Sequence, residues 1–323
     1  MNEAMGEPQA KLNLHDRIIL VVLIGSLTFV VSYYISMLGG GEGSDFKNIL
    51  DPAREWLAGK DIYLPFRLNL DPLAVPYPFT TYLLSVPLTW MVDRFAASFF
   101  LGLGSALLAW LISKTGKNWY LLIFLSWPFV NNIFFAQFAP YIVSLYFTPA
   151  LFLFLFIKPQ LALPFVLTQR PNRIGLLMGG ILLLVSLALY PMWISDWLKS
   201  MHIDNYIGYP PLFTLPLGPL IFLALIRYRE KRAWLLVLLA AMPQRMVYDQ
   251  LGVLLVAENR KQLLFLVICS WISLPVLLYY GGWQYVPWGW QTWVLIASYL
   301  PALLVVLYPI VMDFSKAHFN FFD

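Results

Sequence analysis

Long apolar runs separated by short polar intervals dominate the chain. The first extends from Ile18 to Leu38, and others cover residues 95–113, 175–190, 262–280 and 292–312. Several runs approach or exceed the roughly 20 residues that an α-helix needs to cross a bilayer. The runs are continuous and do not alternate with polar residues, which favours helices over the strands of a membrane barrel. We therefore predict an all-α fold, a polytopic transmembrane helical bundle.

The pattern changes between residues 119 and 167, where polar residues and prolines interrupt the apolar sequence at short intervals. Non-helical backbone at membrane depth is tolerated only where it is buried in protein or lines a water-filled cavity. We predict several short or broken helices here that do not all cross. For the whole chain we expect roughly eight to eleven helices, short ones included. The interruptions are Trp127-Pro128, Asn131-Asn132, Gln137–Pro140, Thr148-Pro149 and Lys158-Pro159.

The longest polar interval, residues 39–78, directly follows the first apolar run. Within it, residues 46–57 repeat apolar side chains near i, i+3, i+4 and i+7, which is typical of an amphipathic helix lying in the membrane interface. Gly59 stands where a glycine that ends a helix is expected. Asp45 precedes this helix, so one interpretation of its carboxylate is a helix N-cap. The other interpretation is a general base held just above the bilayer, and the two are compatible.

Basic residues gather in short loops at 170–173, 227–232 and 260–261, as the positive-inside rule expects of cytoplasmic loops. With Lys11 and Arg17 before the first run, this distribution places the N-terminus in the cytoplasm. We expect a single integral membrane domain, residues 1–323, in the cytoplasmic membrane.

The predicted topology assigns each polar interval to one side of this membrane. Residues 79–92 are expected to cross, with Asp93-Arg94 as a tight cytoplasmic turn and 95–113 running outward again. The predicted outer loops are 39–78, 193–212 and 281–291.

Composition supports a membrane protein and excludes several other classes. The chain is 60% hydrophobic and 12% charged, whereas soluble domains carry about 25% charged residues. The net charge of +4 comes from the basic loops and is not the signature of a nucleic-acid-binding surface. The single Cys269 excludes an intrachain disulfide. The histidines, His15, His202 and His318, lack metal-ligand spacing, so we predict no protein-built metal site and no cofactor.

Two cations interrupt apolar sequence. Lys158 lies in FLFLFIKPQLALPF, where a charge at a helix centre costs about 3 kcal/mol on insertion scales. It can snorkel to the interface, or stand at the tip of a helix broken by Pro159 and face a phosphate. Arg245 can pair with Asp249 at i, i+4 as a structural contact, or present its guanidinium to phosphate oxygens. No P-loop, no GxGxxG after a strand and no Ser-His-Asp arrangement is present, which argues against a soluble nucleotide site.

The order of several short motifs resembles the polyprenol-phosphate-sugar-dependent glycosyltransferases of the GT-C fold class. The chain is most similar to the GT87 group, which includes mannosyltransferases. Each motif alone is weak, and their order over nearly the whole chain is the more specific signal. They are Ser44-Asp45-Phe46 with EWLAGKDIY at 55–63, VPYPF at 75–79, Ala136-Gln137, Lys158-Pro159, and Pro243 followed by Tyr248-Asp249.

The resemblance implies a reaction. A hexose, mannose-like, would pass from a polyprenyl-phosphate-linked donor to a hydroxyl of a lipid or glycan acceptor at the outer membrane face, with inversion at the anomeric carbon. Asp45 would be the general base, and Lys158 and Arg245 would bind the donor phosphate. One carboxylate suffices, because a phosphate leaving group needs electrostatic stabilisation rather than a general acid. The residues that would line the substrate cavity are Tyr63, Tyr77, Gln137, Gln160, Tyr248 and Asp249.

Two other functions are alternatives. A transporter or flippase of a lipid-linked substrate also needs broken helices and intramembrane charge. It predicts paired interrupted helices in two related halves, and the sequence shows no such repeat. A non-catalytic membrane scaffold explains neither Lys158 nor Arg245.

Overall fold

The computed structural model describes residues 12–38, 44–68, 76–201, 210–243, 247–280 and 289–319, and these ranges contain helices and turns but no strand. The all-α prediction is therefore confirmed. Four helices in these ranges are long and apolar enough to cross a membrane: α1 at Leu14–Leu38, α5 at Asp93–Thr115, Arg260–Tyr280 and Gln291–Pro309. A fifth is counted if α9 (Arg173–Leu189) and α10 (Trp193–Ser200), which meet at an 89° bend, form one span.

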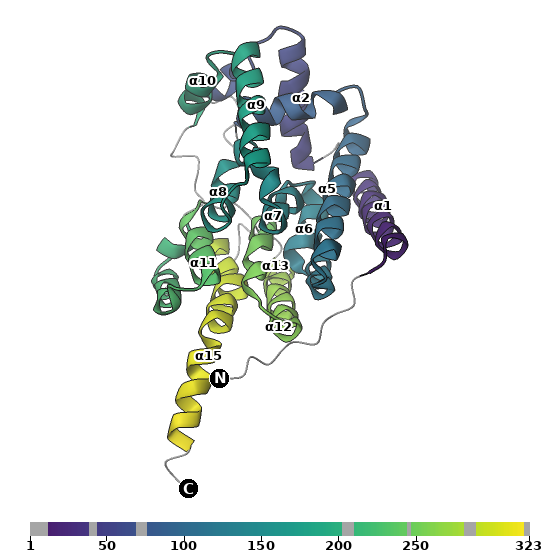
Figure 1. The fold of residues 1–323 in the computed structure, drawn as a ribbon. Helices are drawn as coiled ribbons and strands as arrows, with labels where there is room; N and C mark the ends of the chain where they lie inside the picture. The colour runs from purple at the N-terminus through teal and green to yellow at the C-terminus, as the bar shows by residue number, and fades with distance from the viewer. Residues whose placement is uncertain are drawn as a thin grey trace.

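The two long helices α1 and α5 pack against each other and run in opposite directions (Figure 1). Arg17, near the start of α1, lies 5.4 Å from the ring of Trp110, near the end of α5. Midway along the pair, Gly25 faces Gly102 so closely that a Cβ added at Gly102 would lie 2.9 Å from the Gly25 carbonyl oxygen. Small residues at this contact let the two backbones approach, as is typical of helix pairs in membranes.

The predicted amphipathic helix is present as α2 (Lys47–Leu57), preceded by the short helix η1 (Ser44–Phe46). Its apolar side chains Ile49, Leu50 and Ala53 are at most 1% exposed. They pack on α4 (Phe79–Ser85) and α5, so protein covers this face, and the position of α2 in the membrane interface stays a prediction. The segment that follows residues 39–78 folds back against α2 and covers its apolar face.

Gly59 ends α2, as predicted. It has a φ of 75°, and its N–H donates to the carbonyl of Trp56 at 2.9 Å while the N–H of Lys60 donates to that of Glu55 at 2.9 Å. This pair of bonds satisfies carbonyls that the helix end leaves without partners.

The predicted crossing over residues 79–92 is wrong. After α4 and η2 (Val86–Leu88), the chain returns to α2, where Arg54 donates to the carbonyls of Thr89 and Met91, both at 2.9 Å. Arg54 also pairs with Asp93 at 2.6 Å. Asp93-Arg94 therefore lies at the α2 end of the bundle, and α5 runs away from that end. The helical residues 79–88 rise only about 15 Å. This stretch is too short to cross a bilayer.

The broken middle of the chain is confirmed. Its five helices have eight to ten residues each: η3 (Asn118–Leu125), α6 (Trp127–Phe135), α7 (Ala139–Phe147), η4 (Pro149–Phe156) and α8 (Pro159–Thr168). They carry the chain back and forth through the bundle, and two of their reversals, at residues 136–138 and 157–158, lie in its interior.

The described residues form fifteen α-helices, many of only one to three turns, so the fold is more fragmented than the predicted eight to eleven helices. The number of membrane crossings stays a prediction. The remaining elements are α3 (Leu64–Arg67), η6 (Pro211–Phe213), η7 (Gly218–Arg227), α11 (Lys231–Ala241), η8 (Val247–Val256), α12 (Arg260–Ser270), α13 (Ser273–Tyr280), α14 (Gly289–Val294), η10 (Leu295–Tyr299) and α15 (Leu300–Phe319).

Parts of the first two predicted outer loops contact each other. Trp197 of α10 donates from Nε1 to the carbonyl of Pro76 at 3.1 Å, and Asp196 pairs with Arg67 at 3.7 Å. In Figure 1, α2 and α10 lie at one end of the molecule and α15 extends at the other. Residues 202–209 of the second loop and 281–288 of the third lie outside the described ranges.

Candidate functional site

Four points of the chain where helices begin or end bring polar side chains together inside the bundle. Asp45 stands in η1, Gln137 between α6 and α7, and Lys158 between η4 and α8, while Tyr248 and Asp249 stand at the start of η8. We call these five residues the polar cluster. All five were predicted as site residues, and the structure places them in one hydrogen-bonded group.

The Gln137 amide is central to the polar cluster. Its Nε2 donates to Oδ2 of Asp45 at 2.9 Å, and its Oε1 accepts from Nζ of Lys158 at 3.4 Å. The Tyr248 hydroxyl donates to the same Asp45 oxygen at 3.3 Å. On its other side, Nζ of Lys158 pairs with Oδ1 of Asp249 at 2.8 Å and lies 5.5 Å from the centre of the Tyr248 ring.

The ion pair of the polar cluster is buried, whereas Asp45 is half-buried. The side chains of Lys158 and Asp249 are 8% and 2% exposed. Removing two charges from water carries a penalty of several kcal/mol per ion, which their mutual attraction offsets only with good geometry and further hydrogen bonds. The ion pair therefore depends on its neighbours, and snorkelling of Lys158 to an interface is not what the structure shows.

The break at Pro159 explains why Lys158 reaches this place. Proline lacks an N–H and disfavours helical backbone at the residue before it, and Lys158 accordingly has φ −141° and ψ 77°. The carbonyls freed by the break are satisfied by two buried threonines of α4. Thr81 donates to the carbonyl of Ile157 at 2.8 Å, and Thr80 donates to that of Phe156. This pair was not predicted from the sequence, although two adjacent threonines in an apolar stretch are a visible signal.

Gln137 is placed by a tight reversal of the chain. α6 ends at Ala136, which has a φ of 47° in the left-handed region, and α7 begins directly after Phe138 with Pro140 in its first turn. Asn132 of α6 donates from Nδ2 to the carbonyl of Tyr248 at 3.0 Å. This bond holds the start of η8 against α6 and so fixes both sides of the polar cluster.

The N-termini of α7 and α8 also lie at the polar cluster, directly after Gln137-Phe138 and Lys158. A helix N-terminus carries a partial positive charge and unsatisfied N–H groups, which favour a nearby anion. In membrane transporters, the N-termini of discontinuous helices face anionic substrate groups in the same way. Together with Lys158, the two helix ends make this region suited to a phosphate.

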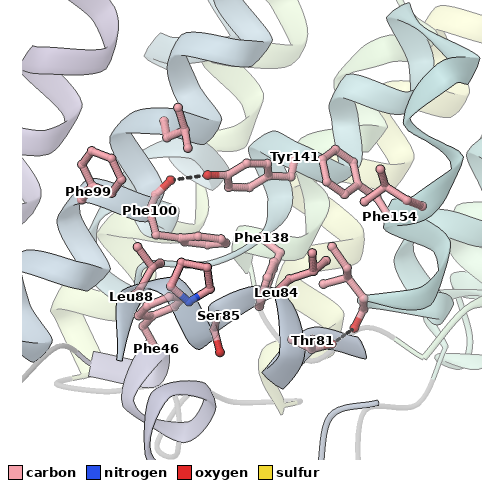
Figure 2. Close-up of a pocket in the computed structure, with 14 residues that line it drawn as sticks. Phe46, Thr81, Leu84, Ser85, Leu88, Phe99, Phe100, Phe138, Tyr141 and Phe154 are labelled. Atoms are coloured by element: carbon pink, nitrogen blue, oxygen red, sulfur yellow. Dashed lines mark hydrogen bonds between the residues drawn. The ribbon is translucent and has the colours of Figure 1, made fainter. Parts of the chain in front are cut away.

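Figure 2 shows a largely apolar cavity of about 350 Å³ with lining residues from α4, α5, α7 and η4. Phe46, Phe138 and Ile157 line it, and each is the sequence neighbour of a polar-cluster residue, Asp45, Gln137 and Lys158 respectively. The cavity also extends to the surface between α4 and α5. Three of its lining residues there are 40% to 54% exposed: Leu84, Phe99 and Leu103.

The other predicted site residues are placed differently. The Tyr63 hydroxyl donates to the carbonyl of Tyr77 at 3.0 Å, and the Tyr77 ring lies 6.0 Å from that of Phe138, next to Gln137. Burial raises the pKa of the Tyr63 hydroxyl, which keeps it protonated as a donor. Gln160 is half-buried in the first turn of α8, and its side chain makes no hydrogen bond within the described ranges. Arg245 lies outside those ranges.

Comparison of the chain with protein-family models, with curated proteins and with solved structures finds no match. The resemblance to glycosyltransferases therefore stays a prediction from the order of motifs. The polar cluster and the nearby cavity are the features that indicate a function.

Proposed function

We propose that the chain is a membrane glycosyltransferase. It transfers a hexose, mannose-like, from a polyprenyl-phosphate-linked donor to a hydroxyl of a lipid or glycan acceptor at the outer membrane face. The observation that supports this most is a polar cluster with a carboxylate and a buried lysine, whose sequence neighbours Phe46 and Ile157 line an apolar cavity. A lipid-linked sugar phosphate has both parts, a charged group and a hydrocarbon chain.

In the proposed reaction, Asp45 is the general base. Its carboxylate accepts the proton of the acceptor hydroxyl while that oxygen forms a bond to the anomeric carbon. The bond between this carbon and the phosphate oxygen breaks on the opposite face, so the configuration inverts and polyprenyl phosphate leaves. Gln137 and Tyr248 hold the carboxylate through hydrogen bonds of 2.9 and 3.3 Å to its Oδ2.

The leaving phosphate needs stabilisation of its charge rather than a proton. Lys158 is the described cation that can supply it, aided by the N-termini of α7 and α8. In the structure its charge is balanced by Asp249 at 2.8 Å. An arriving phosphate would therefore share a cation that is already held in place. This lowers the entropic cost of bringing the phosphate and the cation together. Arg245 stays a sequence-based candidate for the same role.

The test is transfer of radiolabelled mannose from polyprenyl-phosphate-mannose to membrane lipids by the full chain in proteoliposomes. Asp45→Asn should lower the rate by a factor of about 100 or more, as loss of a general base does. Asp51→Asn is the matched control, because Asp51 lies on the same loop but pairs with Arg54 on α2. Equal rates for the Asp45→Asn protein and the native protein would remove Asp45 as the base.

A transporter or flippase of a lipid-linked substrate is the second candidate. The convergence of short helix ends at the polar cluster favours it, since discontinuous helices form transporter binding sites. The same proteoliposomes separate the two functions. Movement of the lipid-linked sugar to the opposite leaflet, with no product formed, would support transport over transfer.

A further inference from the structure

We propose that Gln137 is a positioning residue that keeps the Asp45 carboxylate and the Lys158 ammonium from forming a direct ion pair. The inference rests on the proposed function only for calling Asp45 a base. Its structural content, the separation of the half-buried Asp45 from the buried Lys158 by one amide, concerns the polar cluster itself.

The geometry of the amide carries the inference. Gln137 uses both ends of its side chain, donating to Asp45 at 2.9 Å and accepting from Lys158 at 3.4 Å. The ion pair that Lys158 makes is with Asp249, at 2.8 Å, and not with Asp45. The lysine is thus held from one side by a carboxylate and from the other by the amide oxygen, and Asp45 lies beyond that amide.

The residue type matches this position. A neutral amide offers one acceptor and two donors, so it satisfies an ammonium and a carboxylate at once. A glutamate here would place a second negative charge against Asp45, and a leucine would satisfy neither group. The reversal at Ala136, with φ 47°, directs the side chain between η1 and the start of α8.

The separation has a chemical consequence. A cation within about 4–6 Å favours the ionised form of a carboxylate and lowers its proton affinity by 1–3 pKa units. A carboxylate paired directly with Lys158 would accept a proton less readily, and the lysine would be less able to stabilise a phosphate. Gln137 keeps the two charges in separate roles.

Other charged and titratable groups of the polar cluster also affect the protonation of Asp45. Among the described residues these are Tyr248, which bonds to Asp45, and the paired Lys158 and Asp249. All three are kept unchanged in the variants below, so a shift between variants reports the residue at position 137.

The experiment measures protonation of Asp45 without using any substrate. Dicyclohexylcarbodiimide modifies protonated carboxyl groups in apolar surroundings, and peptide mass spectrometry follows labelling of Asp45 against pH in the full chain in detergent. Gln137→Leu should move the labelling midpoint down by about one pH unit, because Asp45 and Lys158 can then pair. Gln137→Glu should move it up by a similar amount, because two carboxylates compete.

Asn131→Leu removes a buried amide of α6 that has no hydrogen bond to the polar cluster within the described ranges, and it should leave the midpoint unchanged. Only protein that is monodisperse by size exclusion is labelled, and Gln137→Ala carries the same expectation as the leucine variant if the latter does not fold. Equal midpoints, or shifts in the same direction for Leu and Glu, would overturn the inference. The two variants could shift in opposite directions while the native protein shows no transferase activity. That outcome would refute the proposed function and leave this inference standing.

Discussion

Two ion-pair sites of the molecule differ in a way that separates a structural charge from a candidate for function. Arg54 on α2 lies at the end of the bundle, where it pairs with Asp51 and Asp93 and donates to two backbone carbonyls. Its side chain is 33% exposed. Lys158 lies inside the bundle with 8% exposure, beside a second carboxylate and an apolar cavity.

The two sites show what makes a charged group a candidate for function. The groups around Arg54 saturate its guanidinium and join α2 to the start of α5, which fully accounts for the residue. Lys158 costs far more to bury and joins elements that the adjoining helix packing already holds together. The polar cluster is the candidate site because it buries a charge that the packing does not require and because a cavity lies near it.

The largest expected effect is on the stability of the buried pair. Lys158→Met leaves Asp249 buried without its cation and should lower the free energy of unfolding by about 3–5 kcal/mol. The double variant Lys158→Met, Asp249→Leu should recover most of that loss, because no charge is then left buried. Denaturant titration in detergent checks both. A double variant as unstable as the single one would contradict the view that the pair's main structural role is mutual compensation.

Filling the cavity should affect a lipid substrate more than the fold. Ser85 lines the cavity and is 5% exposed. Ser85→Phe should raise KM for a long-chain polyprenyl-phosphate donor about tenfold, which corresponds to roughly 1.4 kcal/mol of lost binding. A donor with a short prenyl chain should be less affected. An equal rise for both donors would show that the cavity does not hold the chain.

The end-of-bundle site should respond weakly. Arg54→Met removes ion pairs that are partly exposed, and such pairs contribute about 0–1 kcal/mol each. The variant also loses two hydrogen bonds to backbone carbonyls. In total we expect the free energy of unfolding to fall by roughly 1–2 kcal/mol. The transfer rate should change far less than in Asp45→Asn. A rate loss as large as that of Asp45→Asn would place Arg54 in the chemistry and remove the contrast drawn above.

The smallest expected effect concerns the backbone at the polar cluster. Ala136 has a φ of 47°, where a residue with a Cβ is strained by about 1–2 kcal/mol. Relief of this strain in Ala136→Gly should raise the unfolding free energy by about 1 kcal/mol. The conformational entropy that glycine loses on folding should reduce this gain. Thermal unfolding checks the sign. A clear destabilisation would mean that the alanine methyl contributes packing that outweighs the strain.

Much of the helical pattern could be predicted from the sequence. The first span, α2 with Gly59 at its end, α5 and the broken middle all follow from local features such as periodicity and proline spacing. The direction of α5 could not be predicted, because an apolar stretch at 79–92 has the same hydropathy whether it crosses or folds back. Arg54 decides the matter through contacts with residues 35 to 39 positions later.

The members of the polar cluster were predicted, but their arrangement was not. The order of motifs pointed to Asp45, Gln137, Lys158, Tyr248 and Asp249, since each is an unusual residue in its context. Which side chain bonds which depends on helix packing between segments up to 203 residues apart. A substrate cavity was predicted, but none of the six residues expected to line it lines the cavity of Figure 2. Its aromatic and leucine side chains look like any other core residues in a sequence.

Each wall residue Phe46, Phe138 and Ile157 is covalently next to a residue of the polar cluster. In the proposed reaction, this adjacency fixes the distance between the bound phosphate and the start of the apolar cavity. The first carbons of the lipid meet the protein at a fixed depth below the sugar, whatever the total length of the chain. Carbons beyond Leu103 would lie among lipids, so the proposed transferase would distinguish carriers by the segment next to the phosphate and would tolerate variation at the far end.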